Sequence, residues 1–216
     1  MIILGLTGSI GMGKSTAARM LRRLGVPLFD ADATVHRLLG ARGGAAAQVE
    51  AAFPGVRGPG GAIDRGRLGQ RVFGNADALR RLERILHPMV ADAEKRFLGL
   101  ARARRAPVVV LDIPLLFESR GGRGFDYVLV VSAPAWVQRQ RVLRRPGMSA
   151  ARFASILGQQ TPDREKRRRA DFVVSTGLSH ALTQRQLRRI LALVQRPDQS
   201  RRRSARPGSA RHPRRR

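Results

Sequence analysis

The chain has 216 residues, of which 43% are apolar, and carries 42 Lys and Arg against 15 Asp and Glu, a formal charge of +27. This length suits one compact domain with insertions, and the apolar share is enough to build a core. No apolar run reaches the roughly 18 residues of a membrane span, and the absence of cysteine excludes disulfide scaffolds, thiolate zinc sites and cysteine nucleophiles. We expect a cytoplasmic protein without membrane association, whose first residues form a strand and not a secretion signal.

The excess of positive charge is compatible with polyanionic partners, either nucleic acid or small molecules rich in phosphate. Coding bias explains it equally well, because all but three of the basic residues are arginine. Residues 196–216 contain nine arginines, one acid and no apolar periodicity, which predicts a basic disordered tail. Contact of this tail with RNA or a membrane surface is the alternative, and we expect no nucleic-acid partner for the rest of the chain. The sequence does not determine an oligomeric state.

Short apolar or β-branched runs alternate with helical patterns along the chain. The expected strands are 2–7, 26–29, 108–111, 127–131 and 172–174, and the expected helices are 14–24, 76–104, 134–145, 149–159 and 178–195. Such an alternation predicts an α/β fold in which a mainly parallel, five-stranded sheet lies between layers of helices. The interval between the second and third strands is far longer than a crossover needs, so it should hold a helical insertion.

A glycine-rich motif connects the first strand to the first helix. The residues GSIGMGKS at 8–15 satisfy G-x-x-x-x-G-K-[ST] in the required strand–loop–helix context. Glycines let successive amides turn toward phosphate oxygens, and the helix N-terminus adds its positive dipole. Lys14 is then expected to reach the β- and γ-phosphates, Ser15 to ligate Mg²⁺, and Thr16 to lie near the α-phosphate. The motif predicts a nucleoside triphosphate site.

A triphosphate site alone does not identify the reaction. The chain lacks the Asn-Lys-x-Asp motif with which GTPases read guanine, and it is short for an oligomeric motor ATPase. A small-molecule kinase remains, and such an enzyme needs carboxylates near the acceptor hydroxyl and the metal, together with mobile cations.

Acidic residues follow two of the predicted strands. Asp30 and Asp32 come after the second strand, where a carboxylate can orient the acceptor hydroxyl or take its proton. Asp32 is the better candidate for this role, although it could merely cap a helix that starts at Ala33. Asp112 ends the strand VVVL, where P-loop proteins usually hold Mg²⁺, or it is a turn acid. Glu118, which follows the apolar segment PLLF, is a further candidate acid, and the alternative is an ion pair with an arginine.

Basic side chains supply the mobile cations. Arg141 and Arg145 are spaced i, i+4 on one predicted helix and should face the same way, as in an arginine-rich lid that closes over ATP. His87 and Pro88 are expected to end a helix, and a histidine there is more often packed than catalytic.

Several blocks of sequence resemble the dephospho-coenzyme A kinase family. They are LTGSIGMGKST, FDADATVHRLL, GAIDRGRLGQRVFGNADALRRLERILHPMV, DIPLLFE, QRQRVLRRPGMS and QTPDREKRRRADFVVSTG, in the order and spacing of that family from residue 2 to about 177. The P-loop is generic among kinases, whereas the other blocks together are specific.

This resemblance implies transfer of the ATP γ-phosphoryl group, with Mg²⁺, to the ribose 3′-hydroxyl of dephospho-coenzyme A, the last step of coenzyme A synthesis. Asp32 matches the proposed base, residues Gly11, Met12, Gly13, Lys14, Ser15 and Thr16 match the ATP loop, and Arg141 and Arg145 match lid arginines. Asp32, Arg65 and His87 are carried over as substrate-binding residues, and Ser15 and Asp112 as metal ligands. The implied organisation is a P-loop NTPase fold over 1–195, comprising a nucleotide-binding core (1–32, 105–141, 170–195), a substrate-binding insertion (33–104) and a lid (142–169).

Two other functions remain open from the residues. A nucleoside or nucleotide monophosphate kinase would use the same P-loop. A nucleic-acid-binding regulator would rest on charge and the tail alone, and its RNA binding should depend steeply on salt and survive loss of Lys14.

Overall fold

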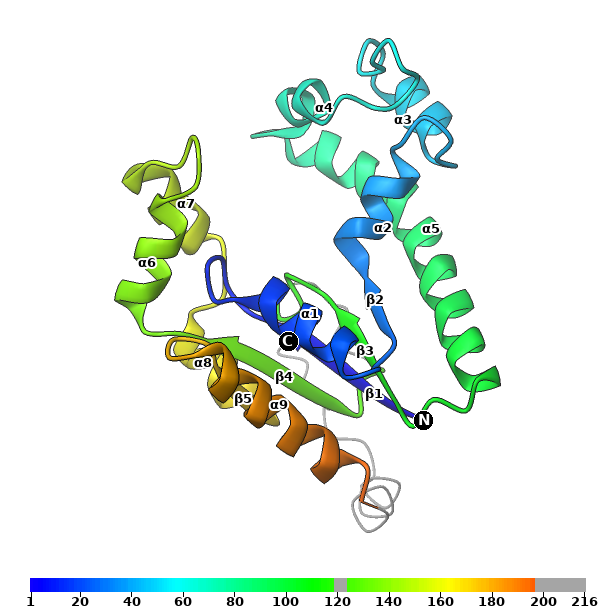
Figure 1. Cartoon of the computed structure of the whole chain (residues 1–216). Coiled ribbons are helices and arrows are strands. Elements are labelled where there is room, and N and C mark those ends of the chain that lie inside the picture. Colours follow the sequence, from blue (N-terminus) through cyan, green and yellow to red (C-terminus); the bar gives the residue numbers. More distant parts are fainter. Residues whose placement is uncertain (119–123, 197–216) are drawn as a thin grey trace, which may run out of the picture. The chain divides into compact units, whose positions relative to one another are not determined.

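The computed structural model describes residues 1–118 and 124–196 of the chain. These residues form two compact units, one made of Met1–Leu28 together with the chain from Arg105 onward, and the other of Phe29–Arg104 (Figure 1). We call them the core unit and the helical unit. The predicted tail at 196–216 lies outside the described residues except for Arg196.

A five-stranded sheet in the order β2-β3-β1-β4-β5 organises the fold. The pairs β1–β3, β1–β4 and β4–β5 are all parallel, which confirms the predicted P-loop type of α/β fold. The strands are β1 (Ile2–Thr7), β2 (Leu28–Asp30), β3 (Val108–Asp112), β4 (Tyr127–Ser132) and β5 (Phe172–Ser175).

The second strand begins two residues later than predicted. The Val26 amide donates to the Leu21 carbonyl at 3.1 Å and so closes the end of the first helix. Pro27 has no amide hydrogen to donate to a sheet. The strand expected at 26–29 therefore becomes β2, which starts at Leu28.

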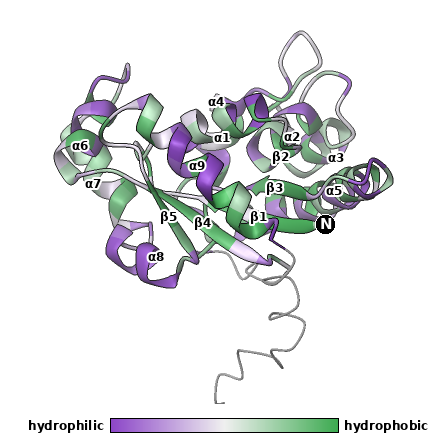
Figure 2. Ribbon diagram, turned by 60° about the horizontal axis from the view of Figure 1, so that its bottom comes forward, coloured by the Kyte–Doolittle hydropathy of each residue, from purple (hydrophilic) through white to green (hydrophobic). Residues whose placement is uncertain are grey.

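Helices of the core unit cover both faces of its sheet. They are α1 (Lys14–Arg23), α6 (Ala135–Leu143), α7 (Ala150–Gly158), α8 (Asp163–Arg169) and α9 (His180–Val194). Helices α1 and α9 contact each other on one face, and α8 packs against β4 on the opposite face (Figures 1 and 2). This arrangement gives the expected three layers.

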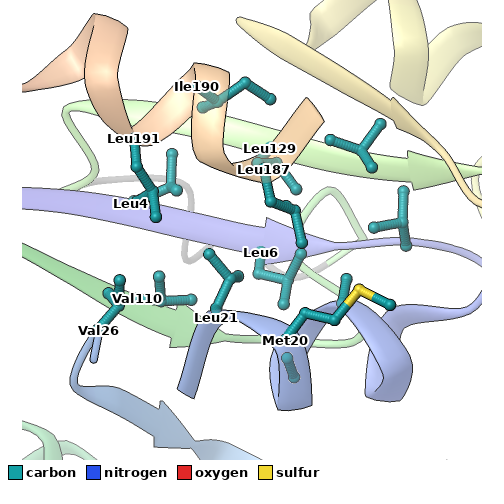
Figure 3. Close-up of a cluster of buried hydrophobic side chains, with 14 of the residues drawn as sticks. Leu4, Leu6, Met20, Leu21, Val26, Val110, Leu129, Leu187, Ile190 and Leu191 are labelled. Atoms are coloured by element: carbon teal, nitrogen blue, oxygen red, sulfur yellow. The ribbon is translucent and has the colours of Figure 1, made fainter. Parts of the chain in front are cut away.

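Alternate strand residues point into one apolar cluster between the sheet and helices α1 and α9 (Figure 3). Leu4 and Leu6 of β1 are fully buried, as is Leu187 of α9. Burying a leucine side chain contributes about 2 kcal/mol. The strands are accordingly hydrophobic along their length, whereas α8 is mostly hydrophilic (Figure 2).

The helical unit has its own apolar core. Its helices are α2 (Ala31–Leu38), α3 (Ala46–Ala52), α4 (Arg65–Val72) and α5 (Ala76–Ala103), and the first three all contact α5. The buried cluster is Leu39, Ala45, Ala46, Val49, Phe53, Val56, Ile63, Leu68 and Leu86. Side-chain caps start several of these helices: the Asp64 carboxylate, for example, accepts from the Gly66 and Arg67 amides.

The helix expected over 76–104 is confirmed as α5, which runs from Ala76 to Ala103. The separate expectation that a helix ends at His87 and Pro88 is wrong, because α5 continues through both residues. A proline inside a helix removes one hydrogen bond and crowds the preceding turn. Around this point Leu86 is buried, and Ile85 and Met89 pack against the same cluster. We attribute the continuation of the helix to this packing. Within the described residues, no helix combines the length and apolar character of a membrane span.

Candidate phosphate-binding site

The loop between β1 and α1 has the backbone shape that the motif predicts. Gly11 and Gly13 have φ angles of 76° and 84°, in the left-handed region. A Cβ on Gly11 would lie 2.5 Å from a methyl group of Val142, and one on Gly13 would lie 2.8 Å from the Thr176 hydroxyl. Both positions therefore require glycine for conformation and for space.

Side chains from distant parts of the core unit bind the carbonyl groups of this loop. Gln138 Nε2 donates to the Ile10 carbonyl at 2.8 Å, and Thr176 Oγ1 donates to the Met12 carbonyl at 2.7 Å. The Ile10 amide in turn donates to Gln160 Oε1 at 3.0 Å. These contacts fix the direction of successive peptide planes.

Several amides of the same loop remain available to a ligand. In the part of the chain that the structure describes, the amides of Gly11, Gly13, Lys14 and Ser15 have no acceptor. They surround the first turn of α1, where the helix dipole adds partial positive charge. Such a nest of amides can bind phosphate oxygens.

Lys14 and Asp112 form an ion pair beside this nest. Lys14 Nζ lies 2.6 Å from Asp112 Oδ1, and the carboxylate is only 4% exposed. Asp112 is the last residue of β3, which pairs directly with β1. Sheet register therefore brings together two predicted residues that lie 98 positions apart in the chain.

The predicted metal ligands are a hydroxyl and a carboxylate. Ser15 is exposed on the first turn of α1, and Asp112 lies at the end of the neighbouring strand. Hard oxygen donors of this kind suit Mg²⁺, which usually takes its remaining ligands from phosphate and water. Among residues 1–118 and 124–196 there is no group of three or more acidic or histidine side chains that could hold a metal by itself.

The two predicted lid arginines differ in their surroundings. Arg141 on α6 donates to the Thr176 carbonyl at 2.6 Å and lies 3.5 Å from the Gly11 carbonyl oxygen. Arg145 lies beyond the helix and is exposed. The prediction that Arg141 and Arg145 share one face of a helix is therefore wrong, because α6 ends at Leu143. Arg145 directly precedes Pro146, and the ring of a proline disfavours the helical conformation of the residue before it.

The acidic pair at the start of α2 has divided roles. Asp30 is the N-cap, and its Oδ1 accepts from the Ala33 amide at 2.9 Å. The alternative that Asp32 caps a helix from Ala33 is therefore wrong, because the helix begins at Ala31. Asp32 lies in the first turn with an exposed side chain that has no polar partner among the residues described.

The remaining substrate candidates lie in the helical unit. Arg65 is the first residue of α4 and is exposed. His87 is exposed on α5 and lines an open pocket with Arg80, Glu83, Arg84 and Pro88. This pocket carries positive charge from its arginines, with one carboxylate.

Among the described residues, Glu118 pairs with a lysine and not with an arginine, the partner named in the alternative. Lys166 on α8 is fully buried, and its Nζ lies 2.8 Å from Glu118 Oε1. Burial by itself raises the pKa of Glu118. The hydrogen bonds from Lys166 and from the Thr161 amide lower it by more than this, so that the pKa lies below its ordinary value of 4.5. The lysine was missed because it lies within a run of arginines that looks solvent-exposed.

Removing either partner of this pair should destabilise the fold. We expect Lys166→Met to cost about 3 kcal/mol, because Glu118 would remain largely buried without its cation. Urea unfolding measures this loss.

The ion pair also makes stability depend on pH. Glu118 stabilises the protein above pH 4.5, and this contribution is lost as the pH falls through its lowered folded-state pKa. Urea unfolding as a function of pH measures the free energy of unfolding across this range. The variant Glu118→Gln should show a smaller loss of stability on acidification than the wild type, and an identical loss would contradict the assignment.

Residues that support the loop were not predicted. Gln138 and Gln160 are the first residues of two of the blocks that resemble the family, but neither block predicted a role for them, and both lie well over 100 positions from Ile10. Thr176 directly follows β5, so the rule that ligands gather at the carboxyl ends of parallel strands could have identified it.

Comparison with known proteins places this geometry in a family. The family model described as dephospho-CoA kinase matches residues 2–180. The dephospho-CoA kinases of Novosphingobium aromaticivorans and Rhodospirillum rubrum are 57% and 58% identical, over 89% of this chain and 94% and 92% of theirs. A crystal structure from Thermus thermophilus is 36% identical with a TM-score of 0.75 and covers 89% of this chain and 97% of its own. A Campylobacter jejuni dephospho-CoA kinase is 25% identical with a TM-score of 0.61, over 89% and 96%.

Proposed function

Because the chain belongs to the dephospho-CoA kinase family, we propose that its phosphate loop binds ATP and that the γ-phosphoryl group passes to the ribose 3′-hydroxyl of dephospho-CoA. ATP-dependent phosphorylation of dephospho-CoA is the last step of coenzyme A biosynthesis. The observation that carries the proposal is the nest of free amides beside the Lys14–Asp112 pair, in a chain that matches the family over residues 2–180. The cytoplasm, which supplies ATP, is the proposed location.

Lys14, Ser15 and Asp112 act on the phosphates of ATP. When ATP binds, the Lys14 ammonium neutralises charge on the β- and γ-phosphate oxygens. The Ser15 hydroxyl and the Asp112 carboxylate would hold Mg²⁺, which supplies charge neutralisation on the β- and γ-phosphates. The amides of Gly11, Gly13 and Lys14 hold the non-bridging oxygens in a fixed direction, so no reorganisation is needed as charge develops.

Asp32 is proposed to orient the acceptor hydroxyl. Its carboxylate accepts the proton of the 3′-hydroxyl while the oxygen attacks the γ-phosphorus, and the bond to the ADP oxygen breaks. The free side chain of Asp32 supports this role, because Asp30 already supplies the helix cap.

The lid is proposed to be shorter than the predicted range 142–169. Helix α8 belongs with the sheet, because Lys166 is fully buried and Asp163 Oδ2 accepts from the Ser132 hydroxyl at 2.7 Å. Val142 is buried as well. The segment 143–159, which contains α7 and Arg145, is the part left to close over ATP.

We expect the two lid arginines to respond differently to substitution. Arg145→Ala should lower kcat by about a hundredfold or more and leave the melting temperature unchanged, because its exposed guanidinium acts only on the transferring phosphoryl group. Arg141→Ala should lower both, since its hydrogen bonds to Thr176 support the loop. Steady-state kinetics and thermal unfolding measure this contrast. Equal losses of stability would show that Arg145 has a structural role.

The helical unit offers a site for the anionic part of the acceptor. Dephospho-CoA carries a diphosphate, and the pocket beside His87 presents Arg80 and Arg84. Arg65 adds a further exposed cation in the same unit. We propose His87 and Arg65 as substrate-binding residues on this basis.

A coupled assay of ADP release tests the proposed activity. ADP should be released only when both ATP and dephospho-CoA are present, and the product should carry the new phosphate on the 3′-oxygen. Turnover of free nucleosides or nucleoside monophosphates in place of dephospho-CoA would favour the alternative kinase.

A further inference from the structure

Ile10 is held on both its amide and its carbonyl by two glutamine side chains. Gln138 Nε2 donates to the carbonyl at 2.8 Å, and Gln160 Oε1 accepts from the amide at 3.0 Å. Ile10 lies within the phosphate loop, immediately before Gly11. The Gly11 amide belongs to the same peptide plane as the Ile10 carbonyl, which Gln138 holds. The Ile10 amide, which Gln160 holds, belongs to the preceding peptide plane. The two glutamines therefore restrain the two successive planes that lead to the Gly11 amide.

The two glutamines come from the two ends of one helical hairpin. Gln138 lies on α6 and Gln160 lies two residues after α7, and these helices pack side by side (Figure 1). The hairpin between them contains Arg145 and the proposed lid. Among the described residues, Gln160 is the one side chain of segment 143–169 that hydrogen-bonds to the phosphate loop.

The position of Gln160 is itself fixed by buried groups. The amide of the next residue, Thr161, donates to Glu118 Oε1 at 2.8 Å. Glu118 pairs with Lys166, which is fully buried. The backbone at Gln160 is therefore anchored to the loop that follows β3, the strand that carries Asp112.

From this geometry we infer that Gln160 is a positioning residue for ATP binding: its carboxamide oxygen holds the Ile10 amide and, together with Gln138 on the Ile10 carbonyl, fixes the backbone that leads into the phosphate-binding amides. The peptide between Ser9 and Ile10 is restrained at both ends, because its carbonyl accepts from the Met12 amide at 3.1 Å. Loss of the Gln160 acceptor leaves the Ile10 amide without a partner among the described residues and loosens this restraint. Gln160 does not touch the reacting atoms in this role.

The test compares Gln160→Met, which keeps the length of the side chain but removes the acceptor, with Gln195→Met as the matched control. Gln195 is exposed at the end of α9, outside the proposed lid, and its side chain has no polar partner within the described residues. Gln160→Met should raise the KM for ATP about tenfold, the effect of one lost hydrogen bond. The KM for dephospho-CoA should stay close to that of the control, and the melting temperature should fall slightly, because the folded state loses one hydrogen bond. Equal KM values for ATP in the two variants would overturn the inference.

Amide hydrogen exchange gives a readout that does not depend on turnover. In the wild-type protein the Ile10 amide should exchange more slowly than the Gly11 amide, because only the former has an acceptor. In Gln160→Met the Ile10 amide should exchange as fast as that of Gly11. Gln160→Glu retains an oxygen at this position and should restore slow exchange. Fast exchange of the Ile10 amide in the wild type would overturn the inference even if Gln160→Met failed to fold.

Discussion

Replacing Lys14 by alanine is expected to lower kcat by about a thousandfold or more, the largest effect of any single change considered. The ammonium group of Lys14 is the one cation of the described structure that lies both at the start of α1 and beside Asp112. Charge that develops on the phosphoryl oxygens would then lose its nearest positive neighbour. Single-turnover kinetics measure this loss at saturating ATP.

The chain supplies a matched control for Lys14. Lys95 is exposed on α5, and within the described residues its one polar partner is Asp92, in a surface ion pair. Lys95→Ala should leave kcat unchanged. A rate of Lys14→Ala that matched that of Lys95→Ala would contradict the role of Lys14 in transfer.

A second variant separates catalysis from folding. Lys14→Ala leaves the Asp112 carboxylate 4% exposed without that cation, and this should reduce stability. The double substitution of Lys14→Ala with Asp112→Asn removes the charge of this buried carboxylate and should recover part of the stability. It should not recover kcat, because neither residue can then act on the phosphates. Recovery of activity in the double variant would mean that the single variant is only misfolded.

Local patterns predicted most of the elements because each depends on nearby residues. The strands of the core unit follow continuous apolar runs, and the glycine-rich loop lies between a strand and a helix as its motif requires. The wrong predictions concern helix ends, which depend on packing against distant residues or on a nearby proline. Packing of Leu86 against the helical core carries α5 through Pro88, and Pro146 ends α6 before Arg145.

Tertiary contacts of the phosphate loop could not be predicted in this way. The motif identifies Lys14 and Ser15 because their roles require fixed spacing along the chain. Gln138, Gln160 and Thr176 hold the backbone of the loop, and it is the fold that brings them to it, because no fixed spacing along the chain links them to the motif. Lys166 is similar: its local sequence resembles an exposed basic helix, and only the buried Glu118 explains it.

Asp32→Asn is expected to lower kcat by about a hundredfold to a thousandfold and to leave the fold intact. The side chain of Asp32 is exposed and has no polar partner among the described residues, so its replacement breaks no contact. The interaction of its negative charge with the dipole of α2 contributes about 0.5 kcal/mol to stability. An amide at this position can still orient a hydroxyl but cannot take its proton.

Asp30 provides the contrasting variant two residues away. Its carboxylate caps α2, so Asp30→Ala should lower the free energy of unfolding by about 1 kcal/mol, and Asp30→Ser should restore most of this loss. Substitution of Asp32 should therefore lower kcat and leave stability nearly unchanged, whereas Asp30→Ala should lower the free energy of unfolding. Kinetics and urea unfolding of the three variants measure both quantities. Should Asp32→Asn retain wild-type kcat, another group must accept the proton. The assignment would then pass to Asp30 only if Asp30→Ser, which keeps the cap, lost activity.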